Sequence, residues 1–341
     1  MSVGTAGATN GITAISIDLD ATAITIEQVL NTLAATGAGV VDLNASSGSL
    51  TIEAAGDITS DGAVNLTGST GINTSGDITT TGDNIDFNSA VTLADNVQVS
   101  TGAGAGTITF TGAVDGTQNL TLVAGSGNID FDSAVGAGTA LNTLSITSAG
   151  TTTADSTIDA ASFDQTAGTA TNLTGLVSTT GTVDLAAATL NVDGGISGDG
   201  GITLTGATAI NLSSDLTTVN TDINIDNNLT LDGNSHVSTG AGAGTVTFNG
   251  IVEGNTANTE TLEVTAGTGN IDFNGTVGNT TALGAITINS VTNLAADFSI
   301  SASSLNQVAG TLTTLDGLVS TSGTVDLTAA TLDINGGISA D

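Results

Sequence analysis

Apolar–polar–apolar triplets recur along the chain at nearly constant spacing. Five successive triplets begin at Val41, Val64, Ile85, Ile108 and Ile129. Alternate side chains of a β-strand point to opposite faces, so each triplet places two side chains on one face and one on the other. A period of about 22 residues fits three short strands and three turns per coil, stacked in parallel. The pattern predicts an all-β fold, a parallel β-helix (β-solenoid) with three short strands per coil.

A longer repeat contains the short one. The segment Gly56–Asn73 (GDITSDGAVNLTGSTGIN) returns as Gly194–Asn211 (GGISGDGGITLTGATAIN), and the offset between the two copies widens slightly beyond Val114. Fixed long periods are typical of repeat architectures. The sequence therefore predicts four regions: divergent N-terminal coils at 1–55, a six-coil repeat unit at 56–193, a second six-coil unit at 194–335, and the start of a third unit at 336–341.

The triplets also separate interior from exterior. Phe87, Phe110 and Phe131 occupy the third place of their triplets, which predicts one interior stack, with Phe248 and Phe273 as its counterpart in the second unit. Neutral residues often separate the aspartates at the outward place, which avoids like charges on neighbouring strands. Asn and Thr at this place form ladders that stabilise stacked strands. Along the chain the outward places hold Asp42, Asn65, Asp86, Thr109, Asp130, Asp184, Thr203, Asn224, Thr247 and Asp272.

Two stretches fit the coil period poorly, and a third predicts a helix. Residues 25–34 (TIEQVLNTLA) predict a short helix, with Thr25 as its N-cap. The apolar side chains of this helix would share one face, at Ile26, Val29, Leu30 and Leu33. Residues 151–180 and 293–322 are too long for one coil and short for two, and each predicts a coil with an irregular excursion.

Composition narrows the possible partners. The 341 residues include 33 acidic side chains and no Lys, Arg, Pro, Cys, Trp or Tyr, and the formal net charge is −33. Without cations the chain cannot release phosphate counterions, so we expect no nucleic-acid binding and no attraction to anionic lipid. The absence of Cys excludes disulfides and thiolate metal sites. No apolar run is long enough to insert in a membrane, and the first twenty residues do not resemble a secretory signal.

Candidate chemistry is sparse, and we expect no enzyme. Acid–base catalysis would depend on Asp, Glu and the single histidine, His236. A glutamine, Gln98, stands at the place of His236 in the first unit, which indicates a turn-adjacent polar position. No cofactor motif is present, but a strongly acidic surface gathers cations, and calcium is possible. The weak calcium candidates are aspartates in glycine- and asparagine-rich turns: Asp193 with Asp199, and Asp226 with Asp232.

Two segments, Val114–Gly136 (VDGTQNLTLVAGSGNIDFDSAVG) and Gly181–Ser197 (GTVDLAAATLNVDGGIS), resemble giant bacterial β-strand-repeat surface exoproteins, the filamentous-haemagglutinin-like adhesins. The likeness covers most of residues 40–341. It implies a right-handed parallel β-helix, an extracellular or cell-surface location, and adhesion or surface coating.

We therefore expect a structural or adhesive segment of a very long surface protein, or of a non-covalent filament or sheath. It would associate with itself end to end or side by side, or with a glycan or protein receptor on a cell surface. A carbohydrate-, ice- or mineral-binding module is the alternative, and a polysaccharide lyase or hydrolase is a more remote one.

Overall fold

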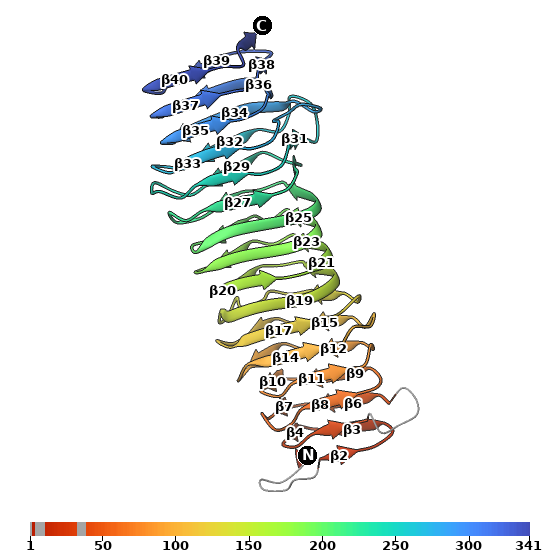
Figure 1. The fold of residues 1–341 in the computed structure, drawn as a ribbon. Coiled ribbons are helices and arrows are strands. Elements are labelled where there is room, and N and C mark those ends of the chain that lie inside the picture. Colours follow the sequence, from red (N-terminus) through yellow and green to blue (C-terminus); the bar gives the residue numbers. More distant parts are fainter. Residues whose placement is uncertain (1, 4–10, 33–38) are drawn as a thin grey trace. The chain divides into compact units, whose positions relative to one another are not determined.

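The computed structural model describes residues 2–3, 11–32 and 39–341, and every regular element within these ranges is a β-strand (Figure 1). The strands pair in parallel and form a β-solenoid of about 15 turns with about 21 residues per turn. This confirms the predicted fold class. The chain divides into two compact units, Met1–Gly175 and Leu176–Asp341.

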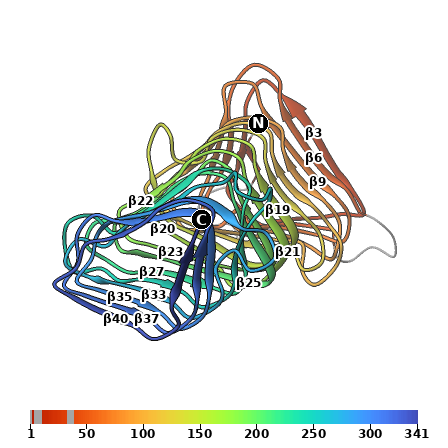
Figure 2. The same ribbon diagram turned by 90° about the horizontal axis from the view of Figure 1, so that it is seen from above.

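In the first unit the strands stack in three columns, and each coil contributes one strand to each column (Figure 2). Column A holds β3 (Ile17–Ala21), β6 (Val41–Ala45), β9 (Val64–Gly68), β12 (Ile85–Phe87), β15 (Ile108–Phe110), β18 (Ile129–Phe131), the second half of β19 (Leu141–Ala154) and β21 (Gly168–Leu173). Column B holds β1 (Ser2–Val3), β4 (Ile24–Ile26), β7 (Leu50–Ile52), β10 (Ile72–Thr74), β13 (Val91–Leu93), β16 (Val114–Asp115), a bridge at Val135 and the start of β20 (Ile158–Gln165). Column C holds β2 (Ile12–Thr13), β5 (Leu30–Asn31), β8 (Ile58–Ser60), β11 (Ile78–Thr80), β14 (Val97–Ser100), β17 (Asn119–Val123), the first half of β19 and the rest of β20.

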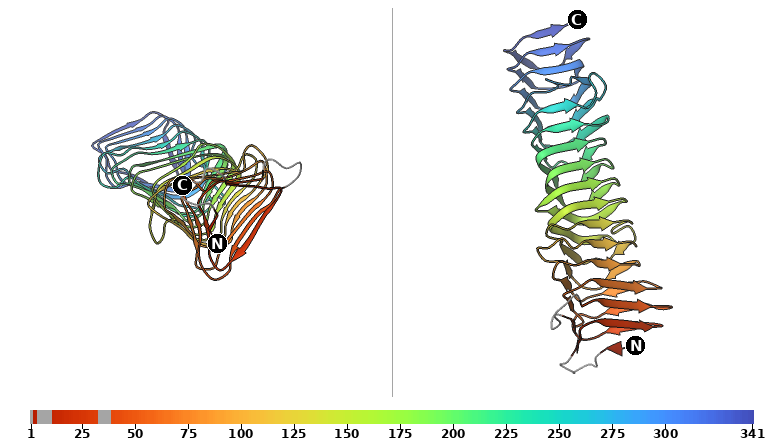
Figure 3. Two further views of the ribbon diagram at one scale, coloured as in Figure 1. Left: turned by 90° about the horizontal axis from the view of Figure 1, so that it is seen from below. Right: turned by 90° about the vertical axis from the view of Figure 1, so that its right-hand side faces the viewer.

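The second unit has three columns of the same kind (Figure 3). Column D holds β22 (Val177–Thr179), β24 (Ile196–Gly198), β26 (Leu216–Thr217), β29 (Ser235–Ser238), β32 (Leu262–Thr265), β34 (Leu283–Ser290), the second half of β36 (Ile300–Gln307) and β39 (Val325–Leu327). Column E holds the first halves of β23 (Thr182–Val192) and β25 (Gly201–Leu212), then β27 (Ile223–Asp226), β30 (Val246–Phe248), β33 (Asn270–Phe273), β35 (Asn293–Ala296), β37 (Leu312–Leu315) and β40 (Thr331–Ile334). Column F holds the second halves of β23 and β25, then β28 (Leu229–Leu231), β31 (Val252–Gly254), a bridge at Val277, the first half of β36, β38 (Val319–Thr321) and β41 (Ile338–Ala340).

The interior of each unit is mostly apolar. The inward members of the triplets are buried throughout the columns, as Val41, Leu43 and Ile85 show at 0% exposure. The predicted phenylalanine stack is confirmed in the first unit. The ring of Phe110 lies 4.6 Å from that of Phe87 and 5.3 Å from that of Phe131, nearly parallel to both.

The second unit contains the counterpart of this stack. The rings of Phe248 and Phe273 are 4.8 Å apart and also stacked. Parallel in-register pairing explains the stacks, because it brings the same triplet position of successive coils into contact.

Buried threonines form hydrogen bonds at several corners between columns. The hydroxyl of Thr101, which is 0% exposed, donates to the Gly106 carbonyl at 2.9 Å, and Thr239 does the same to Gly244 at 2.9 Å. Each threonine begins a TGAGAGT segment, one in each repeat unit. The buried hydroxyl thus satisfies a corner carbonyl that has left the sheet ladder.

The helix predicted at 25–34 is wrong. Residues 24–26 and 30–31 form strands β4 and β5, while residues 33 and 34 lie outside the described residues. Pairing with β7 and β8 buries Ile26 and Leu30 completely but leaves Val29 40% exposed at a corner. A helix would have placed all three on one face, so the gain from the column contacts overrides the helical spacing.

The irregular excursions predicted at 151–180 and 293–322 are also wrong. The first stretch carries the end of β19, then β20, β21 and β22, and the second carries β35, β36, β37 and β38. Leu294 pairs with Thr313 and Ile300 with Val319, so these coils are shorter than the average turn. They are short because β36 runs through two columns as one extended strand, without a separate turn at the corner.

Candidate functional site

The most regular surface feature is a double row of polar side chains along column A, which we name the Asp/Asn/Thr ladder. One row is the outward member of each triplet, and the other is the residue that follows the triplet. Every position of both rows is Asp, Asn or Thr. From the first coil to the last the pairs are Asp18 and Asp20, Asp42 and Asn44, Asn65 and Thr67, Asp86 and Asn88, Thr109 and Thr111, Asp130 and Asp132, Thr153 and Asp155, and Asn172 and Thr174.

The second unit has a corresponding ladder along column E, from Thr203 onward. Only one of its positions, Ala295, departs from the Asp, Asn and Thr pattern. Its pairs are Thr203 and Thr205, Asn224 and Asp226, Thr247 and Asn249, Asp272 and Asn274, Ala295 and Asp297, Thr314 and Asp316, and Asp333 and Asn335.

Sequence reasoning found the first row of the ladder and missed the second. The signal was present, because the triplets extend to the tetrapeptides VDLN, VNLT, IDFN, ITFT and IDFD. The fourth residue was overlooked because the strand was taken to end with the third. In the structure the backbone N–H of the next residue still bonds to the coil before, as that of Asn88 does to the Leu66 carbonyl at 2.9 Å.

Amide side chains of the ladder donate hydrogen bonds to the coil before them. Asn44 Nδ2 donates to Asp20 Oδ1 at 2.8 Å. In the second unit Asn249 Nδ2 donates to Asp226 Oδ1 at 2.5 Å, and Asn274 Nδ2 donates to Asn249 Oδ1 at 2.8 Å. The asparagines therefore supply side-chain N–H donors beside the carboxylates of a chain that has no Lys or Arg.

Where acids crowd the ladder, their protonation is altered. Burial, followed by the charges of Asp18 and Asp20, raises the pKa of Asp42 above its ordinary value. Burial and then Asp297 raise the pKa of Asp272 in the same way. Burial is the larger cause in both cases, and the charge of neighbouring acids adds to it.

Burial also raises the pKa of Asp130, with smaller contributions from Asp132 and Asp155. A hydrogen bond with Thr153 opposes this rise. A hydroxyl in the neighbouring coil therefore helps to keep this carboxylate charged.

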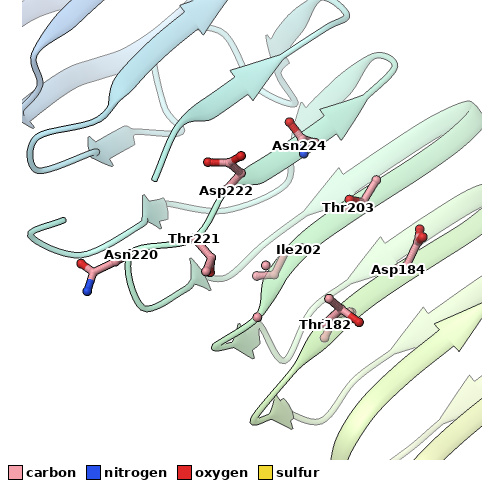
Figure 4. Close-up of a pocket in the computed structure, with 11 residues that line it drawn as sticks. Thr182, Asp184, Ile202, Thr203, Asn220, Thr221, Asp222 and Asn224 are labelled. Atoms are coloured by element: carbon pink, nitrogen blue, oxygen red, sulfur yellow. The ribbon is translucent and has the colours of Figure 1, made fainter. Parts of the chain in front are cut away.

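A surface hollow of about 450 Å³ lies over the start of column E in the second unit. Asp184, Thr203 and Asn224 project from three successive coils on one side of it (Figure 4). The corner residues Asn220 and Asp222 lie on the other side. The hollow is lined by carboxylates, amides and hydroxyls, which suits a polyhydroxyl ligand better than an apolar one.

The hollow owes its shape to a short corner. Gly200 and Gly201 join β24 to β25, and Gly201 has φ +115, which an L side chain rarely adopts. A side chain at Gly200 would meet the backbone of Gly181 at 2.6 Å. Only glycine therefore allows the corner to stay close to the coil below.

The structure places the four weak calcium candidates at three different corners. Asp193 follows β23 in column F, Asp199 follows β24 in column D, Asp226 ends β27 in column E, and Asp232 follows β28 in column F. The predicted partners Asp193 and Asp199 therefore lie at different corners, as do Asp226 and Asp232.

Two of the four candidates, Asp193 and Asp232, lie in the same column, F, two coils apart. Burial, then Asp193 and Glu260, raise the pKa of Asp232. Asp193 Oδ1 accepts a hydrogen bond from Ser213 Oγ at 2.7 Å. Within the part of the chain that the structure describes, no group of three or more His, Asp or Glu side chains is arranged to hold a metal ion.

Other aspartates cap the backbone of the next coil. Asp215 Oδ1 accepts the His236 N–H at 2.9 Å, and Asp222 Oδ1 accepts the Thr245 N–H at 2.8 Å. Asp115 Oδ1 accepts two such bonds, from Gly138 and Thr139. The corner carboxylates thus satisfy backbone donors that leave the sheet ladder.

His236 lies on the outward side of β29, where the sequence predicted a polar position. Its Nε2 is 3.0 Å from Thr265 Oγ1 and 3.9 Å from Glu263 Oε1. Asn289 Nδ2 donates to both of these oxygens, at 3.1 Å and 2.5 Å. The imidazole therefore belongs to a surface network between coils.

Among the residues described, no helix is long and apolar enough to cross a membrane. Comparison with models of protein families, with curated proteins and with solved structures gives no match to this chain.

Proposed function

We propose that this chain is a structural and adhesive solenoid segment of a long extracellular surface protein or non-covalent filament, and that it binds through its Asp/Asn/Thr ladder. The observation that carries the proposal is the ladder itself. Each outward position along column A could have held any polar residue, yet all of them are Asp, Asn or Thr. Packing of the buried core does not require any particular polar residue on the outward side of the strands.

The chemistry of the ladder favours a neutral, hydroxyl-rich partner such as a cell-surface glycan. Carboxylates accept hydrogen bonds, amides donate and accept them, and hydroxyls do both. A formal net charge of −33 repels polyanions. The long-range field therefore selects against anionic polymers, while the local groups suit a polyol.

A mineral surface is the second candidate. Carboxylates such as Asp86 and Asp130 alternate with the neutral Thr109 along one column. Parallel coils repeat about every 4.8 Å, so such carboxylates lie roughly 10 Å apart. A crystal face with cations at a matching interval would bind this array, since carboxylate oxygens are good ligands for calcium.

Co-sedimentation separates these functions. We would measure binding of the purified chain to cellulose, chitin and calcium carbonate particles, and compare it with a Thr109→Lys variant in the ladder. Thr79→Lys, on the outward side of column C, is the matched control. We expect the ladder variant alone to lose binding to the particle that the chain prefers. Equal binding of both variants, or no binding to any particle, would refute the adhesive role.

A further inference from the structure

Asparagine followed by glycine occurs on two successive coils in the middle of the column E ladder. Asn249 and Asn274 hold its second row, the row that follows the triplets, and both are exposed. Gly250 and Gly275 come next in the chain. An asparagine before glycine is the one most open to attack by the backbone nitrogen that follows it, because glycine has no side chain to obstruct the approach.

The stacking of the coils requires both members of this dipeptide. Asn249 Nδ2 donates to Asp226 Oδ1, and Asn274 Nδ2 donates to Asn249 Oδ1. A Cβ atom at Gly250 would overlap the backbone of the coil before, and so would one at Gly275. The ladder thus favours asparagine at the first position, and the close approach of the coils favours glycine at the second.

The backbone nitrogens of these two glycines are not held in the sheet ladder. The N–H groups on either side of Gly250, those of Asn249 and Ile251, both bond to the coil before, at 3.0 Å and 3.1 Å. Within the part of the chain that the structure describes, no hydrogen bond is made by the N–H of Gly250 or of Gly275. Each glycine nitrogen is therefore available to the side-chain amide carbon of the asparagine before it, a reaction within one dipeptide.

A third asparagine of the same row differs at this point. Asn335 also precedes a glycine, Gly336, but the Gly336 N–H bonds to the Leu315 carbonyl at 3.2 Å. That bond holds the nitrogen away from the side chain of Asn335. The sequence motif alone would treat the three asparagines alike, whereas the structure separates the first two from the third.

We propose that Asn249 and Asn274 deamidate spontaneously in the folded chain, and that their conversion turns the second row of the column E ladder into an unbroken run of carboxylates. The glycine nitrogen loses its proton to solvent and bonds to Cγ of the asparagine. The Cγ–Nδ2 bond breaks, ammonia leaves with a proton from water, and a succinimide ring remains. Water then opens the ring at either of its carbonyls, which gives aspartate or isoaspartate, so water is the one co-reactant.

The two asparagines separate acids that would otherwise stand on neighbouring coils. From Asp226 onward the second row reads Asp226, Asn249, Asn274, Asp297 and Asp316. After conversion every one of these positions carries a carboxylate, at intervals of about 4.8 Å. A carboxylate cannot donate the bond that Asp226 now accepts, and like charges on adjacent strands destabilise their pairing. The folded chain therefore loses stability as it ages, most of all at low salt.

Incubation of the folded chain in mildly alkaline buffer made with heavy-oxygen water tests the two sites. Pepsin digestion and mass spectrometry locate each conversion, since the chain offers trypsin no Lys or Arg. The heavy oxygen marks conversions that precede the digestion. We expect label at Asn249 and Asn274, less at Asn335, and none at Asn44 and Asn88, which hold the same row in column A but are not followed by glycine.

A sample unfolded in guanidinium chloride serves as the reference, and the incubation continues until it carries label at both sites. Circular dichroism establishes that the other sample stays folded. Absence of label from either Asn249 or Asn274 in the folded sample overturns the proposal. Labelling of Asn44 and Asn88 to the same extent overturns it as well, because the glycine would then make no difference.

The effect on stability has its own test. Asn249→Asp with Asn274→Asp reproduces the aspartate product, and Asn249→Ala with Asn274→Ala removes the same hydrogen bonds without adding charge. We expect the aspartate variant to melt at a lower temperature than the alanine variant at low salt, and the difference to narrow as NaCl is added. Equal melting temperatures at low salt overturn the proposed effect of the carboxylate run.

Discussion

Truncation of Phe110 is the sharpest test of the interior. Its ring is 1% exposed and lies between the rings of Phe87 and Phe131, at 4.6 Å and 5.3 Å. Replacing a buried Phe with Ala costs about 3–5 kcal/mol, from lost transfer free energy and the cavity left behind. Each stacked pair contributes about 0.5–1.5 kcal/mol beyond burial, and Phe110→Ala breaks two such pairs. We expect a loss near the upper end of the first range.

The matched control for this variant is Phe298→Ala. The chemical deletion is the same, but Phe298 is 52% exposed, so we expect a loss of less than about 1 kcal/mol. The chain has no Trp or Tyr, so the assay is denaturant unfolding followed by far-ultraviolet circular dichroism. Equal losses for the two variants would refute the interior stack. So would a loss below about 2 kcal/mol for Phe110→Ala, because that is less than truncation of a buried aromatic ring costs.

Three further predictions concern charge and buried polar groups. Because burial and Asp297 raise the pKa of Asp272, the folded chain takes up a proton there before the unfolded chain does as the pH falls. Stability should therefore fall as the pH rises above about 4, and melting temperatures should show a smaller fall in Asp272→Asn. The amide oxygen and nitrogen of Gln165 are both buried without a hydrogen-bond partner, so Gln165→Met should raise the free energy of unfolding by about 1–3 kcal/mol in denaturant unfolding. Gln307→Met should raise it by less, because this change removes the 2.7 Å hydrogen bond that Thr313 donates to Gln307. A net charge of −33 should make the melting temperature rise between 10 mM and 150 mM NaCl, a range over which the screening length falls from about 30 Å to about 8 Å; a flat salt profile would contradict self-repulsion as a significant cost.

The sequence was sufficient to predict the interior but not the arrangement of corners. The triplets at Val64, Ile85 and Ile108 predicted parallel stacking because burial alone decides which side chains face inward. The number of coils in a copy depends on turn lengths, which leave a weaker signal. Strands such as β19 and β36 round a corner while still extended. Their coils are therefore shorter than the others, and a uniform period undercounts the turns.

The candidate site was predictable to a similar degree. The outward triplet members marked one row of the ladder, because alternation along a strand fixes which side chains face solvent. The calcium pairs were inferred from closeness in sequence, yet a three-sided coil sends residues six positions apart to different corners. Asp193 and Asp199 are separated in this way, whereas Asp193, almost two coils before Asp232 in sequence, contributes to the raised pKa of Asp232. In a solenoid, neighbours are found one coil away rather than nearby in the sequence.

The same geometry explains how a chain without cations keeps so many carboxylates. Stacked coils leave backbone N–H groups at every corner, and carboxylates such as Asp115 and Asp222 accept them. On the flat columns, asparagines such as Asn44 and Asn249 donate to the acid of the coil below. Hydrogen bonds thus satisfy part of the acceptor capacity of these carboxylates, while repulsion remains between neighbouring acids such as Asp272 and Asp297 and over longer range, where salt screens it. The ladder can therefore hold carboxylates without cationic side chains beside them, and the binding role proposed for it rests on this order of Asp, Asn and Thr.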